Sequence, residues 1–401
     1  MRIITRTVWI LSVISLFADI ASEMLYPVIP VYLKQIGFTV LWIGILEGLA
    51  NFTAGISKGY FGKLSDEKGI RLPFVKLGYF LSSISKPMMA IFTFPIWIFL
   101  ARTIDRLGKG VRTSARDALL SQEATKETKA RVFGLHRGMD TVGATLGPII
   151  ALLFFHFFAG KYKTFFYLAF IPGWISVLLI FLLREKKQVS STLSKGNFFS
   201  FLNYWKIATH EYKKLTIGLL LFALFNSSDI FLILKTQEVL GTRSLNIFHV
   251  EFRSETVAIA AYAFYNLIFA IGSYPLGALA DKYDFRKVFL FGLLLFAVVY
   301  AGFAIASSIE VIFILFFIYG IYAASTEGIV KAWITNIAHD ANTATAVGFY
   351  TSCQSICTLL ASVLAGYIWK WSGSTATFAV TSVATIIIIV YFQWTTKKFS
   401  T

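Results

Sequence analysis

The sequence predicts an all-α membrane protein whose twelve transmembrane helices form two pseudo-symmetric six-helix bundles. Hydrophobic residues make up 57% of the 401 residues and charged residues only 14%, whereas soluble domains are about a quarter charged. Apolar stretches of about 18 residues or more recur along the chain, long enough to cross roughly 30 Å of hydrocarbon. A turn of the form G-x-L-[SA]-D occurs at Gly62 and again at Gly277, each followed by an arginine. Such repetition indicates two halves of one plan.

We expect the spans, in order, at about 8–34, 41–62, 73–94, 96–117, 131–157, 164–183, 214–240, 255–280, 286–307, 309–333, 344–369 and 373–395. The fourth is the most polar, because Arg102, Asp105, Arg106 and Lys109 interrupt it. Those charges cannot face lipid, so the segment either lines a cavity or does not span. Without this span, every later loop would move to the opposite side of the membrane, and the distribution of positive charge argues against that.

The spans divide the chain into an N-terminal six-helix bundle (1–184), a cytoplasmic linker (185–213) and a C-terminal six-helix bundle (214–401). The linker begins with charged and Ser/Thr-rich residues. It continues with the aromatic segment 198–205, which either lies along the inner leaflet as an interfacial helix or is a loop leading into the seventh span.

The net charge is +16, and most of the cations between the spans fall on one side of the twelve-span order, with few on the other. This positive-inside bias predicts a multi-pass protein of the inner (plasma) membrane with both termini in the cytoplasm, and it disfavours a nucleic-acid partner. The cations on that side are Arg2, Arg6, Lys63, Lys68, Arg71, Lys126, Lys129, Arg131, Lys186, Lys187, Lys213, Lys214, Lys282, Arg286, Lys287, Lys397 and Lys398.

Motifs of known chemistry are few. No P-loop, H-E-x-x-H or G-x-S-x-G pattern occurs in the sequence, so we expect neither an enzyme nor an ATP-driven pump, and no cofactor. Cys353 and Cys357 are the only cysteines and lie four apart in one span, so they suit packing rather than a metal site.

Three features together resemble the major facilitator superfamily of secondary transporters: two six-span halves, a basic central loop, and the turn that repeats between spans two and three and between spans eight and nine. Arg106 followed by Gly110 is similar to the family's R-x-x-x-G motif, although Lys109 stands where glutamine is usual. Gly143 to Pro148 resembles the G-x-x-x-G-P motif associated with antiporters. The stretch 105–112, DRLGKGVR, looks like a poorly characterised prokaryotic branch.

The resemblance implies that spans one, four, seven and ten line a central cavity. Span one carries Asp19 and Glu23 on one helical face, with Asp19 about 15 Å deep. Two carboxylates that close in low dielectric resist being charged together, as a proton carrier requires. Arg106 of span four lies at a similar depth and would pair with Asp19 or Glu23, while Asp105 can pair with Lys109. Fixed structural pairing is the alternative to proton coupling.

The second half offers polar counterparts at mid-depth, with Asp229 as the counterpart of the first-span acids. Glu327 and Lys331 lie four apart and can form a local ion pair. The aromatic candidates are either cavity walls or packing residues. The substrate-cavity candidates are Asn226, Tyr262, Tyr265, Asn266, Tyr319, Tyr322, Glu327, Tyr350 and Gln354.

The repeated turns are expected to act as gates. Asp66 can accept hydrogen bonds from a helix N-terminus across the interface between the halves, and Asp281 with Arg286 would repeat the arrangement. Lys63, Lys68 and Arg71 would supply partners for carboxylates such as Asp117. The remaining gate candidates are Gly62, Gly69, the span-five acid Asp140, and the hinge formed by Gly143, Gly147 and Pro148.

From these features we expect a proton-coupled secondary transporter of a small organic molecule that works as a monomer by alternating access, with export by antiport favoured. A proton-coupled uptake symporter is the alternative. A membrane receptor or enzyme on the same scaffold is more remote. The sequence does not choose the substrate.

Overall fold

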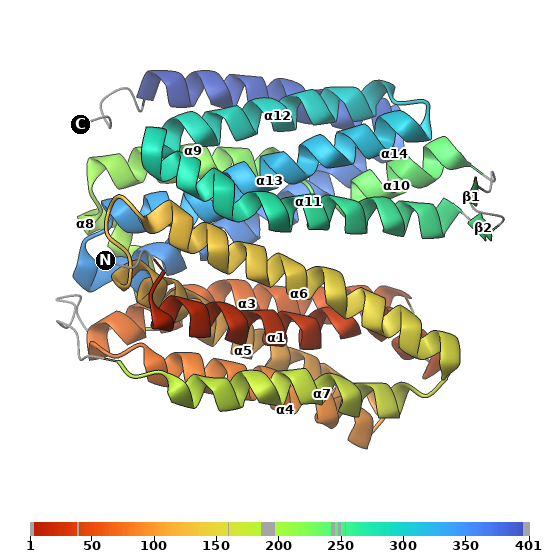
Figure 1. Ribbon diagram of the computed structural model, residues 1–401, viewed down its shortest axis with the longest axis horizontal. Coiled ribbons are helices and arrows are strands. Elements are labelled where there is room, and N and C mark those ends of the chain that lie inside the picture. The colour runs from red at the N-terminus through yellow and green to blue at the C-terminus, as the bar shows by residue number, and fades with distance from the viewer. Residues whose placement is uncertain are drawn as a thin grey trace.

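The computed structural model describes residues 4–37, 40–158, 160–185, 197–241, 245–247, 250–252 and 254–395, and those residues are almost entirely helical (Figure 1). The helices of the N-terminal half are α1 (Arg6–Leu25), α2 (Val28–Gln35), α3 (Val40–Lys68), α4 (Leu72–Ile91), α5 (Pro95–Gln122), α6 (Lys129–Phe157), α7 (Tyr162–Leu179) and the 3-10 turn η1 (Ile180–Leu182). Between the halves lie η2 (Phe198–Asn203) and α8 (Tyr204–Ile207). The C-terminal half comprises α9 (His210–Phe225), α10 (Ile230–Leu240), a hairpin of β1 (Leu245–Ile247) and β2 (Val250–Phe252), α11 (Ser254–Tyr283), α12 (Phe285–Ile305), α13 (Ile309–Ile337), η3 (Asp340–Asn342) and α14 (Thr343–Thr395).

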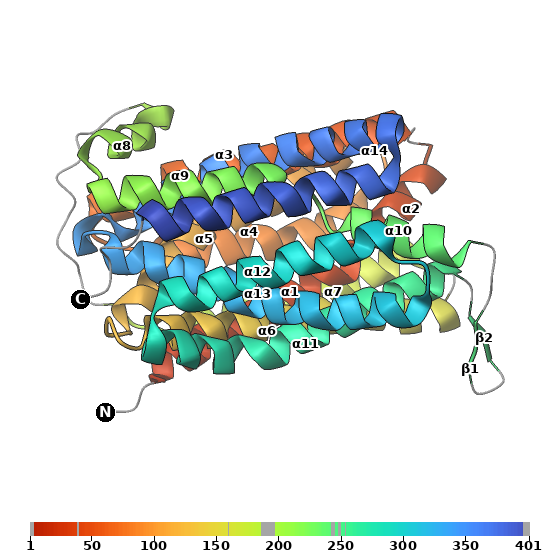
Figure 2. The ribbon, with the colours of Figure 1, turned by 90° about the horizontal axis from the view of Figure 1, so that it is seen from above.

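The two halves form two layers of roughly parallel helices, which confirms the predicted fold class (Figure 1). In one layer α1 packs on α6 and α7, and α4 packs on α5 and α7; in the other, α13 packs on α11 and α12, and α12 packs on α14. The layers meet chiefly where α3 contacts α14 and where α6 contacts α11, and both pairs lie side by side in Figure 2. We call the end of the bundle at which α1 begins and α14 ends the turn end, and the opposite end, beside the β hairpin, the far end.

Hydroxyl side chains cap several helices where polar residues interrupt the apolar pattern. Thr5 accepts a hydrogen bond from the backbone N–H of Val8, and Thr209 accepts one from Tyr212. Each bond satisfies an N–H that has no partner within its own helix, and such a cap stabilises a helix by about 1 kcal/mol. These caps set where α1 and α9 begin.

The first helix of each half is broken, which corrects the expectation of continuous spans at 8–34 and 214–240. Helix α1 gives way to α2 at Tyr26 and Pro27, because proline has no N–H for the helical ladder and clashes with the preceding turn. Helix α9 ends at Asn226, which has extended backbone angles, and α10 begins only at Ile230. The intervening Asn-Ser-Ser-Asp side chains compete with the backbone for hydrogen bonds.

Helix α14 contains both of the last two predicted spans. They turn at Gly373, whose backbone angles (φ 83°, ψ 173°) are not helical. Only glycine adopts such a positive φ without strain. The boundary therefore falls where the sequence predicts the loop between 369 and 373.

Among the described residues, seven helical segments are long and apolar enough to cross a membrane by length and composition. Four of the five remaining spans of the twelve fall short for identifiable reasons. Helix α5 carries the charges noted above, α4 carries Lys76 and Lys86, α9 and α10 are short because of their break, and α14 counts once although it turns at Gly373. Large apolar side chains such as Ile171 and Ile387 remain 54% and 64% exposed on the outside of the bundle, as contact with lipid requires.

The aromatic segment of the central linker packs on the bundle rather than lying free. The Phe201 ring fills the space above Gly59 of α3, where an added Cβ would come within 2.5 Å of the ring. The Trp205 ring stacks on Phe349 of α14 at 5.6 Å between centroids. The segment therefore touches a helix of each half at the turn end.

Candidate functional site

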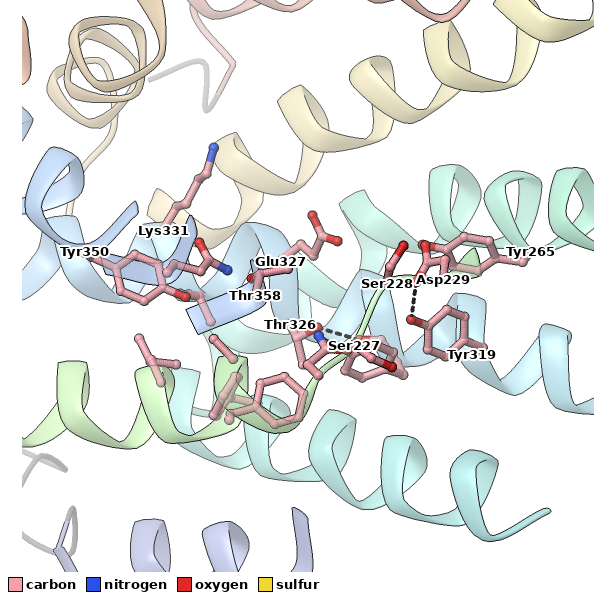
Figure 3. A pocket seen from close by; sticks show the side chains of 18 of the residues that line it. Ser227, Ser228, Asp229, Tyr265, Tyr319, Thr326, Glu327, Lys331, Tyr350 and Thr358 are labelled. Atoms are coloured by element: carbon pink, nitrogen blue, oxygen red, sulfur yellow. Dashed lines mark hydrogen bonds between the residues drawn. The ribbon is translucent and has the colours of Figure 1, made fainter. Parts of the chain in front are cut away.

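A cavity of about 560 Å³ lies in the C-terminal half beside the break between α9 and α10 (Figure 3). Of the lining residues that the structure describes, all but Tyr26, at the break after α1, come from α9, the break, α10, α11, α12, α13 and α14. Broken helices at mid-membrane depth are typical of transporter sites, because the free backbone ends can face a ligand. The predicted candidates that line it are Asn226, Asp229, Tyr262, Tyr265, Tyr319, Tyr322, Glu327, Tyr350 and Gln354.

Asn266 does not line this cavity. It is buried, and its amide donates to the carbonyl of Tyr262 one turn earlier in α11 at 3.0 Å. Its position suits support of the helix that carries Tyr262 rather than contact with a ligand.

The carboxylate of Asp229 lies at the point where α10 begins. The hydroxyl of Tyr319 donates to its Oδ1 at 2.7 Å, and Figure 3 shows the two side chains facing one another. The amide of Asn226 donates to the hydroxyl of Tyr322 at 3.3 Å. Residues of the α9–α10 break are thus held by tyrosines of α13.

Two ion pairs cross between the halves beside the cavity. Glu327 of α13 pairs with Arg137 of α6, and the Nζ of Lys331 lies 2.8 Å from Oδ2 of Asp117 on α5. The expected local pair of Glu327 with Lys331 is therefore wrong, because each finds an opposite charge on the facing half. Both side chains point away from Asp229 toward those helices (Figure 3).

Asp117 and Asp140 also differ from expectation in their partners. Asp117 pairs with Arg116 at 3.1 Å and with Lys331, not with the cations of the repeated turn. Asp140 lies 3.5 Å from His136 and 3.6 Å from Arg137, both on its own helix. Through Arg137, Asp140 belongs to the network that reaches Glu327.

Asp105 of α5 faces a lysine of α4. Asp105 lies 2.6 Å from Lys86 of α4 and 3.4 Å from Arg102, so the expected pair of Asp105 with Lys109 is also wrong. Sequence reasoning missed Lys86, although a lysine within an apolar span is itself a signal of a buried partner. Figure 1 places α4, together with α7, on the side of the N-terminal half away from the C-terminal half, whereas α5 also contacts α13 and α14.

The acids of α1 lie against α6. Among the described residues, the cation that forms an ion pair with Asp19 is Arg112, at 3.9 Å, rather than Arg106. The Arg112 guanidinium lies over the ring of Tyr79 at 4.2 Å. A Cβ at Gly143 would come within 3.1 Å of the Asp19 Cβ, and one at Gly147 within 2.9 Å of the Glu23 Cβ. The predicted close approach of helices at these glycines is confirmed: α6 packs directly against the part of α1 that carries both acids.

The turn that contains Asp66 makes the contact predicted for it. Its Oδ2 accepts from the backbone N–H of Thr345 at 2.7 Å and from the Thr345 hydroxyl at 2.9 Å, at the N-terminus of α14. Arg71 donates to its Oδ1 at 3.1 Å. Gly62 allows the approach, since a Cβ there would lie 2.5 Å from the carbonyl of Ala344. Gly69 ends α3 with a positive φ of 63°, the usual left-handed cap.

The second turn repeats this geometry where α11 meets α6. Oδ1 and Oδ2 of Asp281 accept from the backbone N–H groups of Ala130 and Arg131 at 2.9 and 3.0 Å, at the N-terminus of α6. The cation beside it is Arg131, at 3.7 Å. Arg286 instead donates to the carbonyl of Gln393, so the repeat holds for the aspartate and not for the arginine.

The Major Facilitator Superfamily model matches residues 11–250 and 244–400. The chain belongs to the Major Facilitator Superfamily. It is 32% identical over 386 residues to an uncharacterized MFS-type transporter of Methanocaldococcus jannaschii, MJ1317, covering 96% of this chain and 94% of that one. A 126-residue stretch is 29% identical to the quinolone resistance protein NorA of Staphylococcus aureus, covering 31% and 32% of the two chains.

Solved structures of the superfamily share the fold. The human organic anion transporter MFSD10 superposes with a TM-score of 0.75 at 14% identity, covering 97% of this chain and 99% of that one. FucP in its outward conformation gives 0.76 at 13% identity, covering 98% and 99%. The Major Facilitator Superfamily proteins that match are transporters of small molecules, and this chain has their complete two-bundle architecture.

Proposed function

We propose that this chain is a proton-coupled secondary transporter that exports a small organic molecule across the inner membrane by antiport. The observation that carries the proposal is a polar, tyrosine-lined cavity beside broken helices, with the two halves held together at the turn end by Asp66 and Asp281. Alternating access requires one site and a contact that can open on one side of it. In this reading, residues 1–184 and 214–401 are the moving bundles, 185–213 links them, and the turn end faces the cytoplasm.

Asp19, Glu23 and Asp229 are the proposed proton-coupling groups. Asp19 lies near Arg112 of α5, so protonation of the acid would weaken that attraction and allow α1 to move against α5. The glycines Gly143 and Gly147, where α6 meets α1, support the choice of antiport, since their motif is the one associated with antiporters. Uptake by symport remains the alternative, and it differs in whether protonation assists substrate binding.

The network of Asp117, Lys331, Arg137 and Glu327 is proposed to couple the site to the gate. Each of its two cross-half pairs must break when the halves separate at the turn end. Asp117 is buried, whereas Arg137 and Glu327 are 34% and 42% exposed. The pair of Lys331 with Asp117 should therefore favour the state closed at that end more strongly than the solvent-screened pair of Glu327 with Arg137. A substrate that draws Glu327 away from Arg137 would release the weaker of the two pairs.

Growth of an efflux-deficient bacterium that expresses the chain tests direction and coupling together. Protection against members of a panel of toxic compounds, lost in Asp19→Asn, is expected. Sensitisation would contradict export and support uptake. Equal protection by wild type and Asp19→Asn would remove Asp19 from the coupling step.

A further inference from the structure

We propose that the cavity binds a monovalent organic cation, with the Asp229 carboxylate as its counter-ion and tyrosine rings as its walls. The inference names the substrate class of the proposed transporter and therefore rests on that function. It comes from the charges of the lining residues, the arrangement of the rings, and the partners already taken by the other ionisable groups.

Three of the lining residues that the structure describes carry charge, and two of them are already paired. Glu327 pairs with Arg137, and Lys331 pairs with Asp117, both across the interface. Within the part of the chain that the structure describes, no lysine, arginine or histidine nitrogen lies within 4.0 Å of the third, Asp229. Its bond from Tyr319 supplies a dipole and no positive charge. The cavity therefore has one carboxylate without a cation.

An uncompensated carboxylate is costly at this depth. A bound cation would compensate it, whereas a bound anion would meet it as a like charge. Lys331 and Arg137 do not offer an anion site, because carboxylates of this chain already occupy both. With a neutral ligand, the charge of the Asp229 carboxylate would stay uncompensated unless Asp229 itself were protonated.

The walls beside Asp229 are aromatic and continuous. Ring centroids are 5.4 Å apart between Tyr262 and Tyr265, 4.8 Å between Tyr265 and Tyr319, and 5.1 Å between Tyr319 and Tyr322. Tyrosine faces attract organic cations through their quadrupole, and several rings around one charge form the aromatic cage that recognises quaternary ammonium groups. The carboxylate and the cage favour the same ligand charge.

If the Asp229 carboxylate can hold either a proton or the organic cation, but not both, the transporter exchanges one for the other. When the cation binds, the proton on Asp229 leaves to the solvent on that side; when the cation leaves, a proton takes its place. The two ligands then compete, which is the behaviour of an antiporter rather than a symporter. The cavity volume falls in the usual range for small-molecule sites, about 300–1,000 Å³.

Equilibrium dialysis of the purified full chain with tetraphenylphosphonium and tetraphenylborate tests the charge preference. The two probes have nearly the same shape and opposite charge. We expect tetraphenylphosphonium to bind and to be displaced as the pH falls, and tetraphenylborate neither to bind nor to compete. Equal or tighter binding of tetraphenylborate overturns the inference.

Variants locate the site. Asp229→Asn should weaken tetraphenylphosphonium about ten-fold or more, Asp229→Glu less, and Tyr262→Leu more than Tyr262→Phe, because only phenylalanine keeps the ring. Glu310→Gln changes an exposed carboxylate at the far end, so this variant should bind tetraphenylphosphonium as tightly as wild type does. The same affinity for Asp229→Asn and wild type overturns the inference. Thermal unfolding of each variant checks folding, and the Tyr262 pair keeps the test decisive if Asp229→Asn does not fold.

Proteoliposomes with an imposed pH gradient separate this inference from the proposed function. Binding of tetraphenylphosphonium at Asp229 without gradient-driven flux would uphold the cation site and contradict the transporter. Gradient-driven flux of a neutral or anionic compound, unaffected by tetraphenylphosphonium, would uphold the transporter and overturn the cation site.

Discussion

The contact of Asp66 with the N-terminus of α14 should determine how firmly the turn end is closed. Opening separates α3 from α14 and breaks the two bonds from Thr345, at 2.7 and 2.9 Å, whereas the bond from Arg71 stays within one half. Hydrogen bonds to a charged acceptor contribute about 1.5–3 kcal/mol each and neutral ones about 0.5–1.5 kcal/mol. In Asp66→Asn we therefore expect the closed state to lose about 2 kcal/mol, roughly thirty-fold in the closed-to-open ratio.

Spin labels on either side of the turn end measure that ratio. Labels at Lys126→Cys and Lys282→Cys, with Cys353 and Cys357 changed to serine, report the distance between the halves by pulsed electron paramagnetic resonance. The Asp66→Asn variant should add a longer distance or enlarge that population.

Two further variants calibrate the measurement. Glu211→Gln changes an exposed carboxylate at the same end and should leave the distribution unchanged. Asp281→Asn should repeat the effect, and the double variant should show nearly the sum, because the two contacts share no residue. An unchanged distribution in Asp66→Asn would refute the reasoning that this carboxylate holds the turn end closed.

Three other outcomes follow from the packing. Asp117→Asn should lower the midpoint of thermal unfolding more than Lys331→Met, because it leaves two cations without their carboxylate; the reverse order would contradict the pairing. Gly147→Ala should destabilise by about 1–3 kcal/mol, since its Cβ would lie 2.6 Å from a backbone nitrogen of α1, while Gly366→Ala, with its nearest contact at 3.8 Å, should not. Lys86→Met should lower the same midpoint by leaving its carboxylate partner on α5 less compensated, and an unchanged midpoint would show that Arg102 suffices.

The sequence alone determined the fold class, because hydropathy and the repeated turn depend only on the order of residues. It also predicted the role of Asp66 at a helix N-terminus, since that interaction needs only a carboxylate at a fixed place in a known turn. The candidate cavity residues were found largely by their depth and polarity. Nine of the residues proposed from those properties line the cavity.

The tertiary structure alone decided which charges pair. Sequence spacing favours partners four residues apart, as with Glu327 and Lys331 or Asp105 and Lys109. In the folded chain, Glu327 and Lys331 find partners on the facing half, and Asp105 finds Lys86 on the neighbouring helix. Charges within a membrane gain most from the closest opposite charge in low dielectric, whichever helix carries it. That choice depends on how the helices pack and leaves Asp229 as the carboxylate that faces the cavity without a cation.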